Sequence, residues 1–326
     1  MALNTLAYAA KLQTVLDQKA EAELTSGWMD ANAGQVLYTG GNEIKIPKMS
    51  LTGLKDYDRD SGYPMGGVSL EYETMKMTMD RGTKFQLDEM DIDETNFVTS
   101  ASTVASEFQR TQVIPEVDAY RYSRIAALCT DNAASYDVDS NTVFSHLLDD
   151  IAAVVDEVGE NETLVISINS LVKAQLEKLD AFKKSISVED FLRGEIQTKV
   201  KAVNGMALMP VPSARMRTKY IFRDGKTEGQ EKGGFAPADD AKQINWIIMP
   251  KRAPIAVCKQ DKVKIFTSAQ NQNADAWLVT YRKYHDIWVK DSYKDVIRTS
   301  TGKILTSGKD TQGGTQSGGD QTGKTE

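Results

Sequence analysis

The chain has 326 residues, 40% of them hydrophobic, which is enough for a sizeable core in one large or two interlocked domains. A formal net charge of −7 disfavours sequence-specific binding of nucleic acid, which needs clustered Lys and Arg. The two cysteines, Cys129 and Cys258, lie outside any C-x-x-C spacing and predict neither a zinc site nor a disulfide framework. The longest apolar runs are too short to cross a membrane, so no membrane partner is expected.

The N-terminal third of the chain contains an amphipathic pattern followed by a long hairpin. Leu residues between 6 and 24 recur at helical spacing and predict a helix or arm over residues 1–25. Strand-like residues from Ile44, a turn-rich stretch over 52–67 and an alternating run from Val68 to Met79 predict the hairpin. Seven acidic and seven basic residues lie between Gly41 and Lys84, so we expect neighbouring molecules to order this hairpin.

A long helix is predicted next. An acidic cluster between Asp88 and Glu94 precedes helically spaced apolar residues from Phe97 to Leu128, and acidic residues favour a helix N-terminus. Pro115 lies inside this stretch and removes a backbone donor. We therefore expect one long helix with a kink at Pro115.

The middle of the chain has the pattern of an α/β unit. It begins with an amphipathic helix from Phe144 to Val158 and a short buried strand from Leu164 to Ile168. Asn169 or Ser170 then caps a helix whose apolar stripe extends to Leu179. Further strands are predicted over 200–211 and 244–249, with a loop over 213–243 whose glycine-rich part covers 224–234.

The C-terminal part is rich in β-branched and aromatic residues until the tail begins. Val263–Thr267 and Trp277–Val289 predict long antiparallel strands, and Val296–Thr299 a short one. Beyond Leu305 the chain has no Val, Ile, Leu, Met or aromatic residue, so this tail is predicted to be disordered.

Two motifs match ligand-binding patterns without their structural context. Gly318 with Gly323-Lys324-Thr325 fits the Walker A pattern, but only one residue follows, so no helix can present its N-terminus to phosphate. The run Asp56–Gly62 spaces carboxylates like a calcium loop, yet Ser61 and Gly67 occupy the positions that require glycine and glutamate. We interpret the first as a chance match and the second as a solvated hairpin tip.

The remaining candidate groups also have simpler explanations. Glu71 and Glu73 share one face of a strand, as paired catalytic carboxylates would, but no pocket-forming sequence surrounds them. His146 has acidic residues three and four positions later, which is more typical of a solvated helix face than of a metal site. No common catalytic motif is present. We predict no catalytic, cofactor-binding or metal-binding residue and no enzymatic activity.

The order of these segments resembles one known family. Residues from Ile44 to Asp93, reading IKIPKMSLTGLKDYDRDSGYPMGGVSLEYETMKMTMDRGTKFQLDEMDID, are similar to the extended-loop region of phage major capsid proteins of the HK97-type fold. The stretch from Val104 to Ala126 resembles the spine helix of that family. The resemblance continues through Asn204-Gly205 and Val211-Pro212 to INWIIMPKRAPIAV at Ile244–Val257.

The resemblance implies an α+β fold with an N-terminal arm, an extended loop, a peripheral domain that carries the spine helix and long strands, an axial domain and a disordered tail. The implied boundaries are 1–39 for the arm, 40–85 for the loop, 86–131 with 251–300 for the peripheral domain, 132–250 for the axial domain and 301–326 for the tail. The glycine-rich loop over 224–234 is expected at the tip of the axial domain.

The function implied by the resemblance is structural. The chain would self-assemble into hexamers and pentamers of an icosahedral phage head around double-stranded DNA, held by nonspecific contacts. A scaffolding protein and a portal protein are implied as partners, with the virion capsid as location and the host cytoplasm as the place of assembly. An encapsulin-like compartment shell is the alternative.

The resemblance implies that each extended loop lies over an adjacent subunit, with affinity spread over many contacts. Its charged residues are the expected contacts, at Lys48, Lys55, Asp56, Asp58, Arg59, Asp80, Arg81 and Lys84. Mixed charges of this kind set register and partner choice more than affinity. Some family members form a Lys–Asn isopeptide bond, but nothing here identifies a partner asparagine, so no cross-link is predicted.

Overall fold

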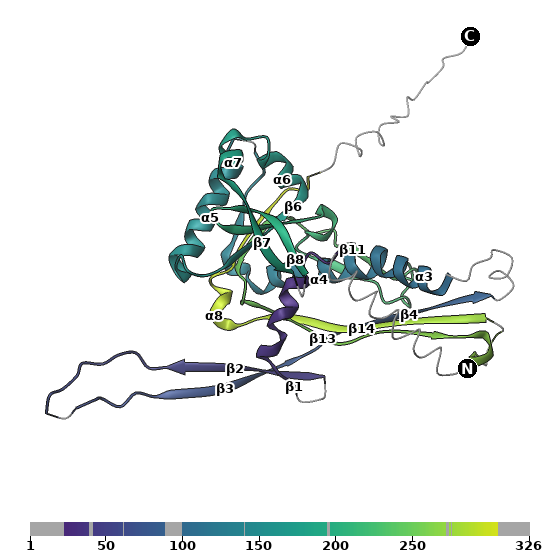
Figure 1. The fold of residues 1–326 in the computed structure, drawn as a ribbon, viewed down its shortest axis with the longest axis horizontal. Coiled ribbons are helices and arrows are strands. Elements are labelled where there is room, and N and C mark those ends of the chain that lie inside the picture. The colour runs from purple at the N-terminus through teal and green to yellow at the C-terminus, as the bar shows by residue number, and fades with distance from the viewer. Residues whose placement is uncertain are drawn as a thin grey trace, which may run out of the picture.

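The computed structural model describes residues 23–38, 42–60, 62–88, 100–139, 141–193, 196–271, 274 and 276–305. These residues form a body around a seven-stranded sheet, a long three-stranded sheet along one side of the body, and a hairpin that projects from it (Figure 1). Helices and strands are mixed, so the α+β class is confirmed.

The seven-stranded sheet forms the centre of the body. Its strands, in spatial order, are β5 (Ala133–Ser135), β15 (Arg298–Gly302), β12 (Gln243–Pro250), β6 (Leu164–Asn169), β9 (Met206–Val211), β8 (Ile196–Val203) and β7 (Ile186–Arg193). Every residue of β6 and β12 is buried, so these two antiparallel strands form the middle of the core. The neighbouring pair β6 and β9 is parallel.

Helices cover part of this sheet. They are α5 (Val143–Val158), α6 (Ser170–Leu176) and α7 (Asp180–Ser185). Leu147 and Val154 of α5 pack in one apolar cluster with Trp246 of β12. The Asn169 side chain accepts a hydrogen bond from the Leu171 N–H at 2.9 Å and caps α6, as predicted.

A long helical stretch runs beside the body. It consists of α3 (Ser100–Phe108), a π-helical segment η2 (Gln109–Val113) and α4 (Ile114–Leu128). Pro115 stands in the first turn of α4, where its missing N–H is tolerated, and the irregular segment lies directly before it. The predicted long helical stretch is confirmed over residues 100–128, with a π-helical segment at Gln109–Val113, whereas the kink at Pro115 stays a prediction.

The three-stranded sheet has the order β13 (Pro254–Phe266), β14 (Ala276–Val289) and β4 (Met79–Asp88), and both of its strand pairs are antiparallel. One face packs on the helical stretch through the rings of Phe108 and Tyr281, whose centroids are 5.7 Å apart. The two long C-terminal strands were predicted, and β13 begins nine residues earlier than the pattern indicated.

The predicted hairpin is confirmed. β2 (Glu43–Leu51) and β3 (Val68–Lys76) pair antiparallel along their whole length, and the short β1 (Leu37–Tyr38) pairs with β2. The other short elements are α8 (Asp291–Lys294), η1 (Gly27–Gln35), η3 (Thr130–Asn132), η4 (Ser213–Arg215) and η5 (Ser268–Gln270).

Several expectations need correction. Residues 200–211 belong to two strands, because Asn204 and Gly205 have φ of 52° and 79° and turn the chain between β8 and β9. The helix predicted to reach Leu179 ends at Leu176, and α7 starts after Leu179. β15 extends to Gly302, past the predicted start of the tail.

The placement of the glycine-rich loop at an axial tip is wrong. The loop is part of a small hairpin of β10 (Tyr220–Phe222) and β11 (Phe235–Pro237). This hairpin lies on α4 and β4, because Arg81 Nη2 donates to the Gly234 carbonyl at 3.1 Å and the Tyr120 and Phe222 rings are 5.6 Å apart. The predicted N-terminal helix up to residue 22, the acidic residues over 89–94 and the tail from 306 lie outside the described residues.

Candidate functional site

The projecting hairpin is fixed to the rest of the chain only at its base. Ile44 and Ile46 of β2, both buried, pack with Met77 against Ile255 and Trp288 of the three-stranded sheet. The alternation of strands places these isoleucines on one face of the hairpin. Farther out, the same face bears Lys48, which is paired with Asp291 of α8 at 2.8 Å.

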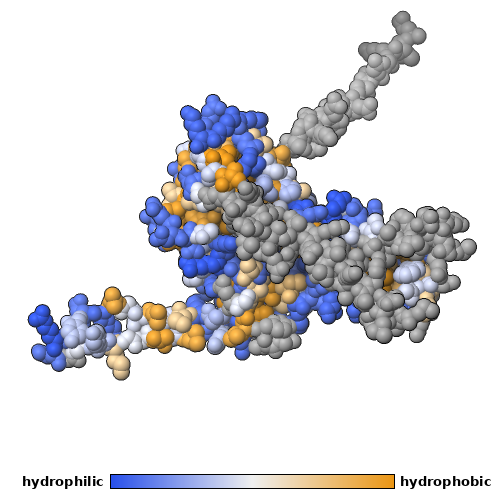
Figure 2. All heavy atoms as spheres, in the orientation of Figure 1, coloured by the Kyte–Doolittle hydropathy of each residue, from blue (hydrophilic) through white to orange (hydrophobic). Residues whose placement is uncertain are grey.

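The opposite face of the hairpin is apolar and exposed. Cross-strand pairing places six residues on this face, and we call them the apolar stripe: Pro47 with Tyr72, Met49 with Leu70, and Leu51 with Val68. Apart from the proline, they are between 48% and 71% exposed. Figure 2 shows hydrophobic surface along the projecting hairpin and hydrophilic surface toward its end. Contiguous exposed apolar surface of this kind is typical of an interaction site.

The tip of the hairpin is mostly polar and holds its own shape. The Tyr57 and Tyr63 rings meet edge to face at 5.1 Å, and Lys55 Nζ donates to the Met65 carbonyl at 2.9 Å. The Asp58 carboxylate accepts from the Asp60 N–H at 3.0 Å. Four of the predicted contact residues, Lys55, Asp56, Asp58 and Arg59, are exposed here.

The other four predicted contact residues lie apart from the tip. Lys48 has Asp291 as its partner, and Asp80 is held by Arg282, whose guanidinium lowers the pKa of that carboxyl group. Arg81 is half-buried in an ion pair with Glu116 of α4. Burial raises the pKa of the Glu116 carboxyl despite this partner. Lys84 is exposed on β4, so the eight residues do not form one cluster.

A second polar site joins the N-terminal segment to α4, and we call it the N-terminal clasp. The fully buried Asp118 carboxylate accepts hydrogen bonds from the backbone N–H and hydroxyl groups of Thr25 and Ser26, at 2.7–3.2 Å. Arg215 of η4 donates to the same carboxylate at 2.9 Å. Burying a carboxylate is costly unless it is hydrogen-bonded and paired in this way.

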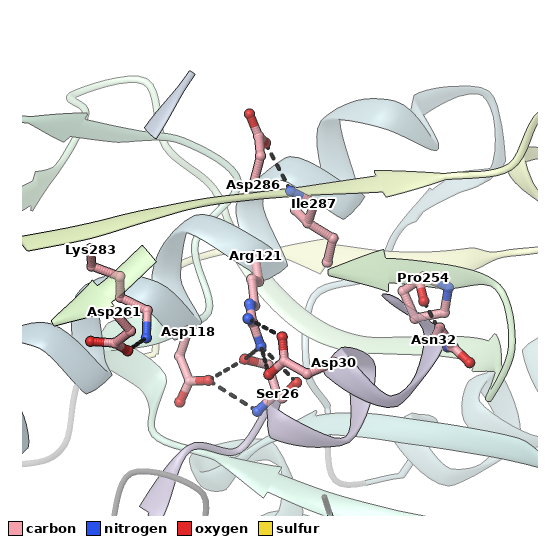
Figure 3. A network of polar contacts seen from close by, with 10 residues as sticks. All are labelled: Ser26, Asp30, Asn32, Asp118, Arg121, Pro254, Asp261, Lys283, Asp286 and Ile287. Carbon is pink, nitrogen blue, oxygen red and sulfur yellow. Dashed lines mark hydrogen bonds and ion pairs between the residues drawn. The ribbon is translucent and has the colours of Figure 1, made fainter. Parts of the chain in front are cut away.

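Arg121, three residues after Asp118 on α4, completes the clasp (Figure 3). Its guanidinium binds Asp30 of η1 through two nitrogens, at 2.6 and 3.0 Å, and also donates to the Ser26 carbonyl. Asn32 adds hydrogen bonds from its amide to the carbonyls of Lys251 and Pro254, at 2.8 and 2.7 Å. Together these contacts tie the segment before the hairpin to both α4 and β13.

A third buried group lies where the hairpin passes into β4. Asp286 of β14 accepts from the Tyr120 hydroxyl at 2.6 Å and from the backbone N–H of Thr78 at 2.8 Å. The neighbouring His285 is 3% exposed and contacts the Tyr120 ring. Burial, together with nearby cations, lowers the pKa of His285 well below its usual value. This junction fixes the direction in which the hairpin leaves the body.

The groups that sequence analysis weighed as catalytic or metal-binding do not converge. Within the described residues, no group of three or more His, Cys, Asp or Glu side chains is arranged to hold a metal ion. His146 stacks on the Tyr136 ring at 4.1 Å, and Asp150 accepts a hydrogen bond from the Trp246 indole at 2.8 Å. No helix in the described part of the chain is long and apolar enough to span a membrane.

Comparison with known proteins gives the fold. No family model and no curated protein matches the chain. The capsid of cyanophage P-SCSP1u matches with a TM-score of 0.57 and 11% identity, over 82% of this chain and 85% of that one. The mature capsid of bacteriophage PhiM1 matches with a TM-score of 0.53 and 14% identity, over 82% and 84%.

A structure from Microbacterium phage Oxtober96 matches with a TM-score of 0.51 and 10% identity, over 84% of this chain and 91% of that one. This chain has the HK97-type capsid fold. The projecting hairpin and the long helical stretch lie in the segments predicted from the sequence as extended loop and spine helix, and these two assignments stay predictions. The charged residues of the hairpin were predicted from the sequence, whereas the apolar stripe and the clasp were not. The alternation of Met49, Leu51, Leu70 and Tyr72 could have revealed the stripe.

Proposed function

We propose that this chain is the major capsid protein of a tailed bacteriophage, a structural subunit that assembles into the shell of the phage head. The observation that carries the proposal is the apolar stripe on a hairpin that reaches away from the body. Within the described part of a single chain, the stripe residues other than Pro47 stay exposed. In a lattice of identical subunits, a neighbouring copy of the chain would cover the apolar stripe of each subunit.

The free energy gained by burying the apolar stripe favours a lattice of many contacts over a dimer. If the five exposed stripe residues each lose about 100 Å² of accessible surface, the gross gain is about 12 kcal/mol at ~25 cal/mol per Å². Association costs about 4–15 kcal/mol in lost freedom and side-chain ordering. A single contact is therefore marginal, whereas several contacts per subunit in a closed shell reinforce one another.

The finer features of the proposal are supported by the likeness to phage capsids. Subunits would form hexamers and pentamers of an icosahedral head, with a scaffolding protein and a portal protein as partners. The shell would enclose double-stranded DNA through nonspecific contacts, form in the host cytoplasm and be part of the virion. We retain Lys55, Asp56, Asp58, Arg59 and Lys84 as contacts between subunits, because each is exposed. Lys48, Asp80 and Arg81 already have partners within the chain, and we assign them a smaller part.

The proposal is tested by expressing the full chain, alone and together with its scaffolding protein, and examining it by light scattering and negative-stain microscopy. Closed shells, capsomers or tubes are the expected products. A monomer under all of these conditions contradicts the proposal. The contents of purified particles separate the phage head, which holds nucleic acid, from an encapsulin-like compartment, which holds a cargo enzyme.

A further inference from the structure

The segment from Arg215 to Lys219 contains three cations, two of which are paired. Arg215 binds Asp118 of the clasp at 2.9 Å. Lys219 binds Asp240 at 2.7 Å. Arg217 lies between them and is half-buried, yet no carboxylate among the described residues pairs with it. Burial lowers the pKa of its guanidinium. A half-buried cation of this kind is stabilised by an anion that completes its pairing.

The guanidinium of Arg217 is bound on one side only. Its Nη1 donates to Gln243 Oε1 at 2.9 Å. Within the described part of the chain, its buried Nε has no hydrogen-bond partner, and its Nη2 has none either. Nε and Nη2 form the edge of a guanidinium that can bind both oxygens of a carboxylate in parallel. Gln243 is fully buried, and its amide Nε2 also lacks a partner among these residues. Both side chains therefore have donors to offer to an anion.

The pair of Arg217 and Gln243 lies where the chain leaves the central sheet. Gln243 begins β12, which pairs with β15, the last strand of the body (Figure 1). The Leu305 N–H donates to the same Gln243 Oε1 at 3.4 Å, and the Leu305 side chain packs on the apolar cluster beneath α5. Lys303 is paired with Asp137 at 2.7 Å. The chain that follows Leu305 therefore starts from a fixed point beside the unpaired guanidinium.

The C-terminal segment supplies a carboxylate within reach of this point. Residues 306–326 contain three acidic side chains, at Asp310, Asp320 and Glu326. Asp310 comes five residues after Leu305. Five residues span up to about 17 Å, so Asp310 can return to the end of the sheet. A group on a longer tether has a lower effective concentration at the site, which favours Asp310 over the two carboxylates that follow it.

We propose that the carboxylate of Asp310 binds the Nε–Nη2 edge of Arg217 and fastens the start of the C-terminal segment to the end of the central sheet. The occupant is a segment of the same chain, because its tether at Leu305 holds it beside the site at every protein concentration. A carboxylate of another molecule would have to come from solution. The contact pairs the half-buried guanidinium and covers the end of β12. The inference does not depend on the proposed function.

The test is hydrogen exchange of the backbone amides of residues 304–311, measured by mass spectrometry in the full chain before assembly. Each rate is divided by that of the same variant unfolded in urea, which removes the intrinsic effect of the substitution. R217Q and D310N should each speed exchange by about threefold to tenfold, because each removes one charge-assisted contact at a half-exposed site. R217Q/D310N should be no faster than either single variant, since both remove the same contact. D320N is the matched control and should exchange like the wild type.

Equal exchange in the wild type, R217Q and D310N overturns the inference, and so does a D320N variant that exchanges as fast as D310N. Faster exchange in R217Q alone assigns the guanidinium to a different anion and also overturns it. Protection that is found only in assembled particles assigns the site to a neighbouring copy, with the same consequence. If R217Q does not fold, the comparison of D310N with D320N decides. None of these outcomes requires assembly to fail, so the proposed function is tested separately.

Discussion

Replacing two leucines of the apolar stripe should impair assembly without weakening the fold. Leu51 and Leu70 are 67% and 53% exposed, so a neighbour can bury roughly half to two thirds of each side chain. At about 2 kcal/mol for a fully buried leucine, L51T/L70T removes about 2.5 kcal/mol from each contact, or roughly 70-fold in its equilibrium constant. Threonine is β-branched and favours strands, so the hairpin strands should be preserved.

The assay measures the protein concentration at which light scattering first reports assembled particles, alongside the urea midpoint of the unassembled chain. The variant should need a far higher protein concentration to assemble. Its free energy of unfolding should stay within about 0.5 kcal/mol of the wild type, as is usual for surface substitutions. Val188 on β7, which is 66% exposed, provides the control V188T. Equal assembly by L51T/L70T and wild type would refute the assignment of the stripe as an interface.

Four further outcomes are expected. D118N should lower the free energy of unfolding by about 2–3 kcal/mol in urea titration, because it removes a fully paired buried charge of the clasp; an unchanged midpoint would count against the clasp. Burial lowers the pKa of His285 in the folded chain. Below a pH of about 6.5 the unfolded chain therefore binds a proton at this histidine that the folded chain does not, so the free energy of unfolding should decrease as the pH falls. H285Q should flatten this dependence, and an equally steep profile would contradict the assignment. G82A should cost about 1–3 kcal/mol, because a Cβ there would come within 2.8 Å of the Tyr281 carbonyl, whereas G53A has open space and should be neutral in the same thermal melts. Assembled particles boiled in denaturant should run as monomers on a gel, and a ladder would contradict the predicted absence of cross-links.

The regular elements could be predicted because their side-chain periodicity is local. The alternation from Ile44 and from Val68 gave the hairpin, and the 3.6-residue spacing from Phe144 gave α5. Asn204 and Gly205 had the chemistry of a tight turn between strands, and their stretch was nevertheless interpreted as continuous strand. Asn-Gly is among the strongest short-range hairpin signals, so this error was avoidable.

The contacts between distant segments could not be predicted, because single-sequence patterns do not record them. Asp118 and Ser26 are 92 positions apart, and nothing in either neighbourhood indicates that they meet. Arg81 likewise reaches Gly234 across 153 positions, which is why the glycine-rich loop was misplaced. The charged residues at 48–84 were predicted as contacts, although three of them form ion pairs inside the chain. The exposed apolar residues beside them were the stronger indication of an interface.

The central claim is that the projecting hairpin binds a second copy of the chain in a closed shell. A three-dimensional reconstruction of assembled particles by electron cryomicroscopy tests it most directly. We expect density for Met49, Leu51 and Leu70 to be covered by protein of another subunit in every capsomer. Shells in which the hairpin stands free in solvent, or folds back on its own body, would contradict it.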